Sequence, residues 1–138
     1  MKNRKKKTNQ KEIFYTWQAF DNDVKFLFEK YAIYKGMLKN IYGIPRGGLV
    51  LAVKLSNLLN IPLITKKREI NKYTLIVDEI YDTGKTIKDL IYGKKYFSIA
   101  VLFANEENIK NIKLPLVIKR LVKSDSCISF PWEREVNR

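Results

Sequence analysis

The sequence contains no histidine and only one cysteine, Cys127, among its 138 residues. Without histidine, the chain cannot build a Ser-His-Asp triad, use a histidine general base or hold a metal ion through imidazole. A single cysteine excludes an intramolecular disulfide and fits a reducing cytoplasm. Any chemistry must therefore come from carboxylates, lysine, hydroxyl groups or backbone amides.

Long apolar runs are also absent. No stretch approaches the roughly 18 residues that a membrane helix needs, and residues 1–10 lack the apolar segment of a secretory signal. We therefore expect a cytoplasmic protein that does not enter a membrane. Hydrophobic residues make up 46% of the chain, enough for a core, and the length corresponds to one domain at about 100–200 residues per domain.

Acidic residues are scarce relative to basic ones. The chain has 14 Asp and Glu against 27 Lys and Arg, and its formal net charge is +13. Residues 1–11 carry much of the excess and no acid, so we expect a basic, disordered tail ahead of a domain of residues 12–138. The tail could contact nucleic acid, but a merely lysine-rich composition is the favoured interpretation. Positive charge would also attract a phosphate-rich small substrate.

Helix-like and strand-like segments alternate along the rest of the chain. Apolar residues spaced by three or four predict a helix over residues 16–31, which Thr16 can cap. Further helices are expected over residues 49–59 and from the end of the 82–86 loop to about residue 92. Strands are expected over residues 39–44, 63–65, 74–78, 98–104 and 116–122. This alternation predicts a single α/β domain with a largely parallel, twisted sheet flanked by helices.

The most informative segment is Thr74–Thr86, TLIVDEIYDTGKT. A buried strand ends at two acids, and a loop that begins at Asp82 then leads into a helix. Ligands collect beyond the carboxyl ends of parallel strands, and a helix start presents unpaired N–H groups that suit phosphate. Gly84 allows close approach of the backbone, and threonine hydroxyls add donors. The loop is therefore predicted to hold a phosphate.

The adjacent acids Asp78 and Glu79 would repel a phosphate ligand unless they have a specific task. They can accept hydrogen bonds from sugar hydroxyls, or bind Mg²⁺ directly or through water. Together with the loop they predict a site for a ribose 5-phosphate. The glycine spacings of a Walker loop and of a dinucleotide fingerprint are both absent.

The segment resembles the signature of the type I phosphoribosyltransferases that binds 5-phosphoribosyl 1-diphosphate (PRPP): an apolar strand, two acids, two apolar residues and D-T-G-x-T. Upstream, Ile41–Leu49 resembles the pyrophosphate loop of that family. A Gly-Gly turn can cradle an anion, and an arginine adds a fork of donors, although such a turn can also serve tight packing alone. The resemblance assigns pyrophosphate to Arg46, Gly47 and Gly48. It assigns the 5-phosphate to Asp82, Thr83, Gly84, Lys85 and Thr86.

The C-terminal segment Ile128–Glu133 resembles the bacterial xanthine-guanine and hypoxanthine phosphoribosyltransferases, as does Ile13–Trp17. This likeness implies that the backbone of Ile128 pairs with a purine. It implies that Glu133 helps Asp78 and Glu79 to hold Mg²⁺. Asp82 matches the acid that faces the purine and would accept or relay its proton.

Three features depart from that subgroup. Cys127 stands where an aromatic ring usually stacks on the purine. Asn105 lies where a lysine usually donates to the purine 6-oxo group; an amide can donate too, but without charge. The flexible hood over the site is reduced to Lys66–Tyr73. All three departures affect base recognition or closure, not PRPP binding.

The resemblance implies an enzyme of purine salvage that transfers phosphoribosyl from PRPP, with Mg²⁺, to xanthine, guanine or hypoxanthine. A homodimer or homotetramer is expected on the same ground. Two alternatives remain: a non-catalytic PRPP or nucleotide sensor on the same fold, and a phosphoribosyltransferase for another base. A nucleic-acid module is not favoured, because no RNA-binding aromatic signature or zinc spacing is present.

Overall fold

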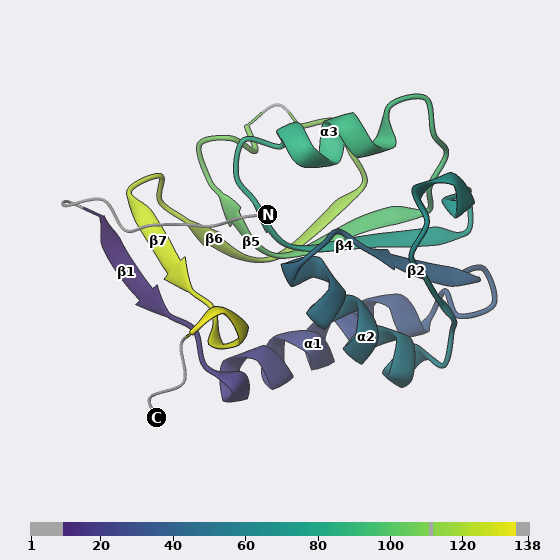
Figure 1. The fold of residues 1–138 in the computed structure, drawn as a ribbon, viewed down its shortest axis with the longest axis horizontal. Helices are drawn as coiled ribbons and strands as arrows, with labels where there is room; N and C mark the ends of the chain where they lie inside the picture. The colour runs from purple at the N-terminus through teal and green to yellow at the C-terminus, as the bar shows by residue number, and fades with distance from the viewer. Residues whose placement is uncertain (1–9, 111, 135–138) are drawn as a thin grey trace.

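The computed structural model describes residues 10–110 and 112–134. At its centre lies a five-stranded sheet with the order β3-β2-β4-β5-β6, in which every neighbouring pair is parallel (Figure 1). Its strands are β2 (Asn40–Gly43), β3 (Leu63–Ile64), β4 (Thr74–Tyr81), β5 (Ser98–Asn105) and β6 (Leu116–Val122). The predicted α/β class with a parallel sheet is confirmed.

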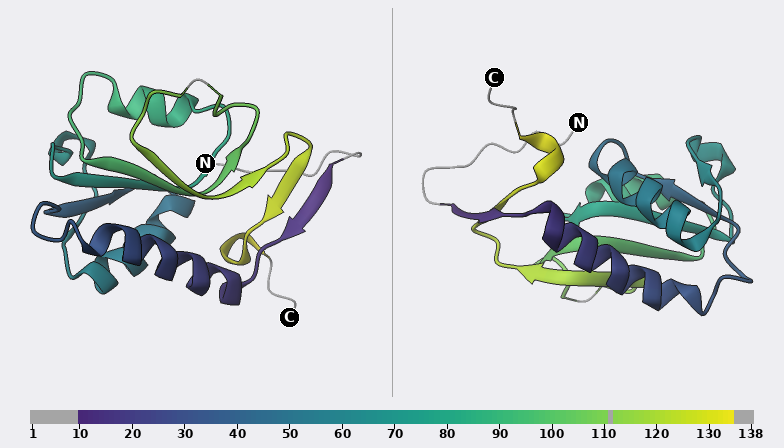
Figure 2. Two further views of the ribbon diagram at one scale, coloured as in Figure 1. Left: turned by 180° about the vertical axis from the view of Figure 1, so that it is seen from behind. Right: turned by 90° about the horizontal axis from the view of Figure 1, so that it is seen from below.

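Helices cover both faces of this sheet (Figures 1 and 2). Helices α1 (Trp17–Ala32) and α2 (Gly47–Leu59) lie on one face, and the shorter α3 (Lys85–Ile91) lies on the other. The Thr16 hydroxyl caps α1 by accepting the Ala19 N–H at 3.0 Å. The predicted apolar stripe of α1 packs into the core through its buried members Phe20, Val24, Leu27 and Tyr31.

The two central strands are buried along their whole length, as expected for a parallel sheet covered on both faces. Strand β4 continues three residues beyond its predicted end at Asp78, because Ile80 and Tyr81 still pair with β5. Helix α2 begins two residues earlier than predicted, at Gly47. Glu79, Gly47 and Gly48 therefore lie inside regular elements rather than in loops.

A second sheet of two parallel strands was not predicted. Strand β1 (Lys11–Phe14) pairs with β7 (Ser126–Ser129), and Ile13 lies opposite Ile128. Both strands have four residues, mixed polarity and partners more than a hundred positions away, so neither carries a strong local signal. Lys11, which was assigned to the basic tail, is the first residue of β1. Residues 1–9 of that predicted tail, and residues 135–138, lie outside the described residues.

Two short 3₁₀ turns complete the described part of the chain: η1 (Lys67–Glu69), within the predicted short hood, and η2 (Pro131–Glu133). Lys67 of η1 lines a cavity of about 490 Å³ that also touches Pro45 and Thr86. The reduced hood thus lies beside both predicted anion loops. Within the described ranges, no helix has the length and apolarity needed to cross a bilayer.

A buried ion pair ties α1 to the edge of the sheet. Asp23, 1% exposed, accepts hydrogen bonds from Arg120 Nε at 2.7 Å, Arg120 Nη2 at 2.9 Å and the Tyr15 hydroxyl at 2.6 Å. Burial, together with the neighbouring Asp23 carboxylate, raises the pKa of Tyr15, so its hydroxyl remains a donor at neutral pH. The pair places Tyr15, which follows the last residue of β1, against the main sheet.

Replacing Arg120 with methionine should lower the free energy of unfolding by about 3 kcal/mol, because the variant leaves the Asp23 carboxylate buried without its cation. We expect the lower end of the range for broken buried pairs, since the Arg120 side chain is 43% exposed. Urea denaturation measures the effect. Lys123→Met, which removes an exposed cation just beyond the same strand, is the matched control. Equal stability of the two variants would contradict the proposed contribution of the pair.

Candidate active site

Two carboxylates lie side by side near the end of β4. Asp78 and Glu79 are each only 1% exposed, and Asp78 Oδ1 accepts the backbone N–H of Glu79 at 2.8 Å. Removing two adjacent acids from water costs free energy that hydrogen bonds or opposite charge must offset. Their position at the carboxyl end of a central parallel strand is where ligands of such sheets bind.

The predicted pyrophosphate loop packs directly against these acids. The Ile44 N–H donates to the Val77 carbonyl at 2.9 Å, which fixes the end of β2 beside β4. A Cβ on Gly47 would lie 1.4 Å from Glu79 Oε2, and one on Gly48 would lie 2.8 Å from the Val77 carbonyl oxygen. A side chain at Gly48 would therefore clash with backbone, and one at Gly47 would displace the Glu79 carboxylate. The loop and the acids, which are separated by about thirty positions in the sequence, therefore form one site.

The predicted phosphate loop borders the same acids on their other side. Residues Asp82–Gly84 connect β4 to α3, and Gly84 has the positive φ of 82° that this turn requires. A cavity of about 170 Å³ is lined by Asp78 and by all residues of 80–87. Lys85 Nζ donates to Asp89 Oδ2 at 2.8 Å, and this partner raises the pKa of Lys85. The predicted phosphate loop thus lines a small polar cavity.

Asp82 and Asn105, which were assigned to the base, lie next to each other at the ends of β4 and β5. Asn105 Nδ2 donates to Asp82 Oδ1 at 3.4 Å, and the backbone N–H of Glu107 donates to Asn105 Oδ1 at 3.0 Å. Asn108 Nδ2 donates to the Asp82 carbonyl at 2.7 Å. Asn108 was missed because no motif includes it, and only the fold brings it to the loop.

The C-terminal segment reaches the same edge of the sheet. Cys127 and Ile128 are buried in β7, and Phe130 is fully buried. The partly buried Trp132 stacks on Phe130, with centroids 4.9 Å apart, and its Nε1 donates to Glu79 Oε2 at 3.3 Å. Phe130 is therefore a core residue, whereas Trp132 connects the segment assigned to the base with the acids assigned to PRPP.

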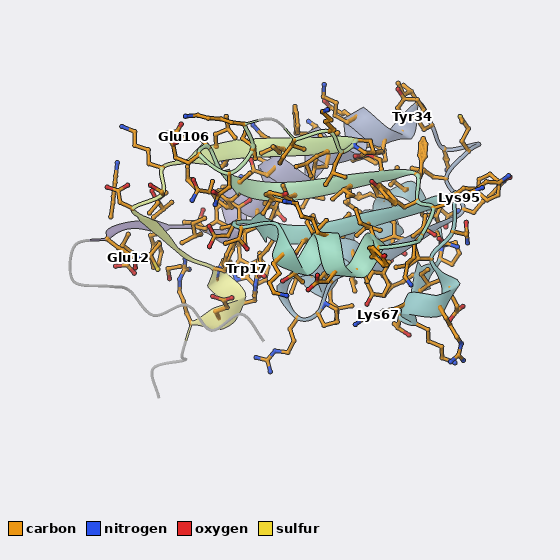
Figure 3. All side chains as sticks on the ribbon, turned by 90° about the horizontal axis from the view of Figure 1, so that it is seen from above. Glu12, Trp17, Tyr34, Lys67, Lys95 and Glu106 are labelled. Atoms are coloured by element: carbon orange, nitrogen blue, oxygen red, sulfur yellow. The ribbon has the colours of Figure 1, made fainter. Side chains whose placement is uncertain are left out.

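Trp17 extends this aromatic group to the start of α1. Figure 3 shows Trp17 beside the turn η2, and its ring centroid lies 5.8 Å from that of Trp132. Phe20 contacts the same indole at 5.3 Å. The front and C-terminal segments that carried the sequence resemblance are thus packed together.

Asp78 and Glu79 are also candidate ligands for a metal ion. Among the described residues, no three His, Cys, Asp or Glu side chains form a group that could hold a metal ion by themselves. Glu133 is exposed in η2, and its grouping with Asp78 and Glu79 stays a prediction. The two acids nevertheless fit Mg²⁺, which proteins commonly hold with one or two carboxylates plus substrate phosphates.

The structure combines a parallel sheet, a Gly-Gly turn, a pair of acids near the end of a strand and a second loop that is predicted to bind phosphate. No family model matches the sequence. The chain is 29% identical to the xanthine-guanine phosphoribosyltransferase of Nitratidesulfovibrio vulgaris, over 88% of this chain and 84% of the relative.

Solved structures agree with this likeness. A purine phosphoribosyltransferase from Pyrococcus horikoshii matches with a TM-score of 0.72 and 29% identity, covering 92% of this chain and 97% of that one. A Neisseria gonorrhoeae protein with bound ppGpp matches with a TM-score of 0.70 over 91% of this chain and 90% of its own. Its identity is 20%, so it shows the fold alone.

In fold and in sequence the chain resembles the type I phosphoribosyltransferases. Within that class, its relatives with 29% identity are named as xanthine-guanine and purine phosphoribosyltransferases. The predicted resemblance, and with it the prediction of an enzyme, is confirmed.

Proposed function

We propose that the protein transfers the phosphoribosyl group of PRPP to a purine, namely xanthine, guanine or hypoxanthine, and releases pyrophosphate. One observation carries the proposal: Glu79 is in van der Waals reach of the Gly47 backbone, and the strand that carries Glu79 leads directly into the 82–86 loop. A ligand with a phosphate at each end of a sugar fits two anion loops with carboxylates between them. PRPP is such a ligand.

The residues act on the donor by position and charge. The acids Asp78 and Glu79 accept hydrogen bonds from the ribose hydroxyls and hold the sugar between the loops. Arg46 and the backbone N–H groups that follow it stabilise the pyrophosphate as its bond to ribose C1 breaks. Mg²⁺, held by these acids with Glu133 and by substrate oxygens, would neutralise charge on the pyrophosphate.

The acceptor base enters beside Asp82 and the C-terminal strand. The backbone of Ile128 pairs with the purine edge, Asn105 donates to its 6-oxo group and Cys127 packs on its face. Asp82 accepts the proton that the base loses as its nitrogen bonds to ribose C1, and no histidine is available for this task. We further propose a homodimer or homotetramer in the cytoplasm.

A panel of bases tests the proposal. Protein, PRPP and Mg²⁺ are mixed with xanthine, guanine, hypoxanthine, adenine or uracil, and pyrophosphate release is measured. We expect release with at least one of the three 6-oxopurines. Pyrophosphate release with adenine or uracil alone would identify a different acceptor base. Tight PRPP binding without pyrophosphate release in the presence of any base would indicate a sensor instead.

A further inference from the structure

The last residue of β4, Tyr81, carries a hydroxyl group for which the structure supplies no partner. Its side chain is 1% exposed, and its Oη is both shielded from solvent and without a hydrogen bond. Leaving such a donor unsatisfied costs about 1–3 kcal/mol. Phenylalanine would fill the same space without that cost, so the hydroxyl requires an explanation outside the free fold.

The hydroxyl lies directly beneath the 82–86 loop. A Cβ on Gly84 would lie 2.1 Å from Tyr81 Oη and 2.3 Å from Cζ, so the loop touches the phenol at its glycine. Tyr81 is also one of the residues that line the cavity of about 170 Å³ at this loop. The unsatisfied donor thus lies against the loop assigned to the 5-phosphate.

The ring itself is held rigidly. It belongs to the apolar cluster between the sheet and α3, in which Ile76, Ile87 and Val101 are fully or almost fully buried. A rigid ring holds its hydroxyl at one place without further loss of side-chain freedom. The remaining freedom lies in the loop, where Asp82 and Thr83 are exposed and Gly84 has no side chain.

We propose that Tyr81 is a phosphate-binding residue: its hydroxyl donates a hydrogen bond to the 5-phosphate when the 82–84 turn shifts to admit the ligand. This inference rests on the proposed function. It adds to the phosphate site a residue, Tyr81, that stands at an apolar position of the sequence motif. In the free protein the donor is unsatisfied, and in the complex it is paired with a charged acceptor. Tyr81 therefore favours the occupied state of the loop over the empty one.

The variant Tyr81→Phe tests whether the hydroxyl stabilises the occupied loop and not the empty one. Calorimetry with ribose 5-phosphate should show affinity at least about tenfold weaker than in the wild type, the usual loss for a hydrogen bond to a charged group. Pyrophosphate alone, which the Arg46 loop binds, should keep its affinity. Without ligand, the urea midpoint of the variant should equal or exceed that of the wild type, because no hydrogen bond is lost.

Tyr96→Phe is the matched control, since the partly buried Tyr96 packs against the same apolar cluster but lines neither the cavity of the 82–86 loop nor the cavity beside Pro45. It should leave both affinities unchanged. Equal ribose 5-phosphate affinity of Tyr81→Phe and wild type, or a lowered midpoint of the free variant, would overturn the role of Tyr81. Failure of the wild type itself to bind ribose 5-phosphate would overturn the proposed function as well, and this outcome is distinct from the other two.

Discussion

Asp82→Asn is expected to lower the turnover number by about 10²-fold or more, within the range that loss of a general base costs. The amide keeps the size of the side chain and an oxygen that can accept from Asn105 Nδ2, and the bond from Asn108 goes to the backbone carbonyl. The loop should therefore keep its shape. What the variant loses is the ability to take a proton from the base. Steady-state pyrophosphate release with saturating PRPP and base measures this loss.

The control for this variant is Asp89→Asn, which neutralises another exposed carboxylate nearby, on α3. It should retain turnover near that of the wild type. Calorimetry should also show that Asp82→Asn still binds PRPP. Turnover of Asp82→Asn equal to that of the wild type would remove Asp82 from the mechanism.

Gly47→Ala is expected to raise the PRPP concentration needed for half-maximal rate by about 10²-fold, since displacements of about 1 Å in a reactive site have effects of this size. The new methyl group would lie 1.4 Å from Glu79 Oε2, so the carboxylate must leave its place or the loop must move. Glu79 can rotate about its own bonds, and the fold should survive. The site should not, because the loop holds the pyrophosphate and the acid holds the adjoining ribose of the same substrate.

Gly36→Ala is the matched control for this prediction, because a Cβ at Gly36 has no atom within 4 Å. Kinetics at varied PRPP, together with circular dichroism of each variant, separate a damaged site from a damaged fold. Unchanged PRPP dependence in a folded Gly47→Ala variant would show that the contact between Gly47 and Glu79 has no part in donor binding.

The sequence predicted those parts of the fold whose signals are local. The alternation of apolar strands with amphipathic helices placed all five strands of the main sheet and all three helices, because each segment carries its own periodicity. The motif around Asp78 and the turn at Gly47 predicted two anion loops at the ends of neighbouring strands. The structure places them together, as a parallel sheet requires.

Other parts depend on contacts between distant segments and could not be predicted. Strands β1 and β7 are short and form only because the two ends of the chain meet. The extension of β4 through Tyr81 depends on pairing with β5, and the contact of Trp132 with Glu79 depends on the path of the C-terminal segment. A tyrosine at the end of an apolar strand is expected to pack. Only the position of Tyr81 beneath Gly84 indicates that its hydroxyl has a role beyond packing.

The most direct test of the site is titration of PRPP, in the presence of Mg²⁺, into the wild type and into a variant that carries both Asp78→Asn and Glu79→Gln. The buried acids between the two loops predict one PRPP bound per chain in the wild type and affinity lower by about 10²-fold or more in the variant, as expected when two hydrogen-bonding charges are removed. No measurable binding to the wild type, or equal affinity in the two proteins, would contradict the assignment of this strand end to the sugar.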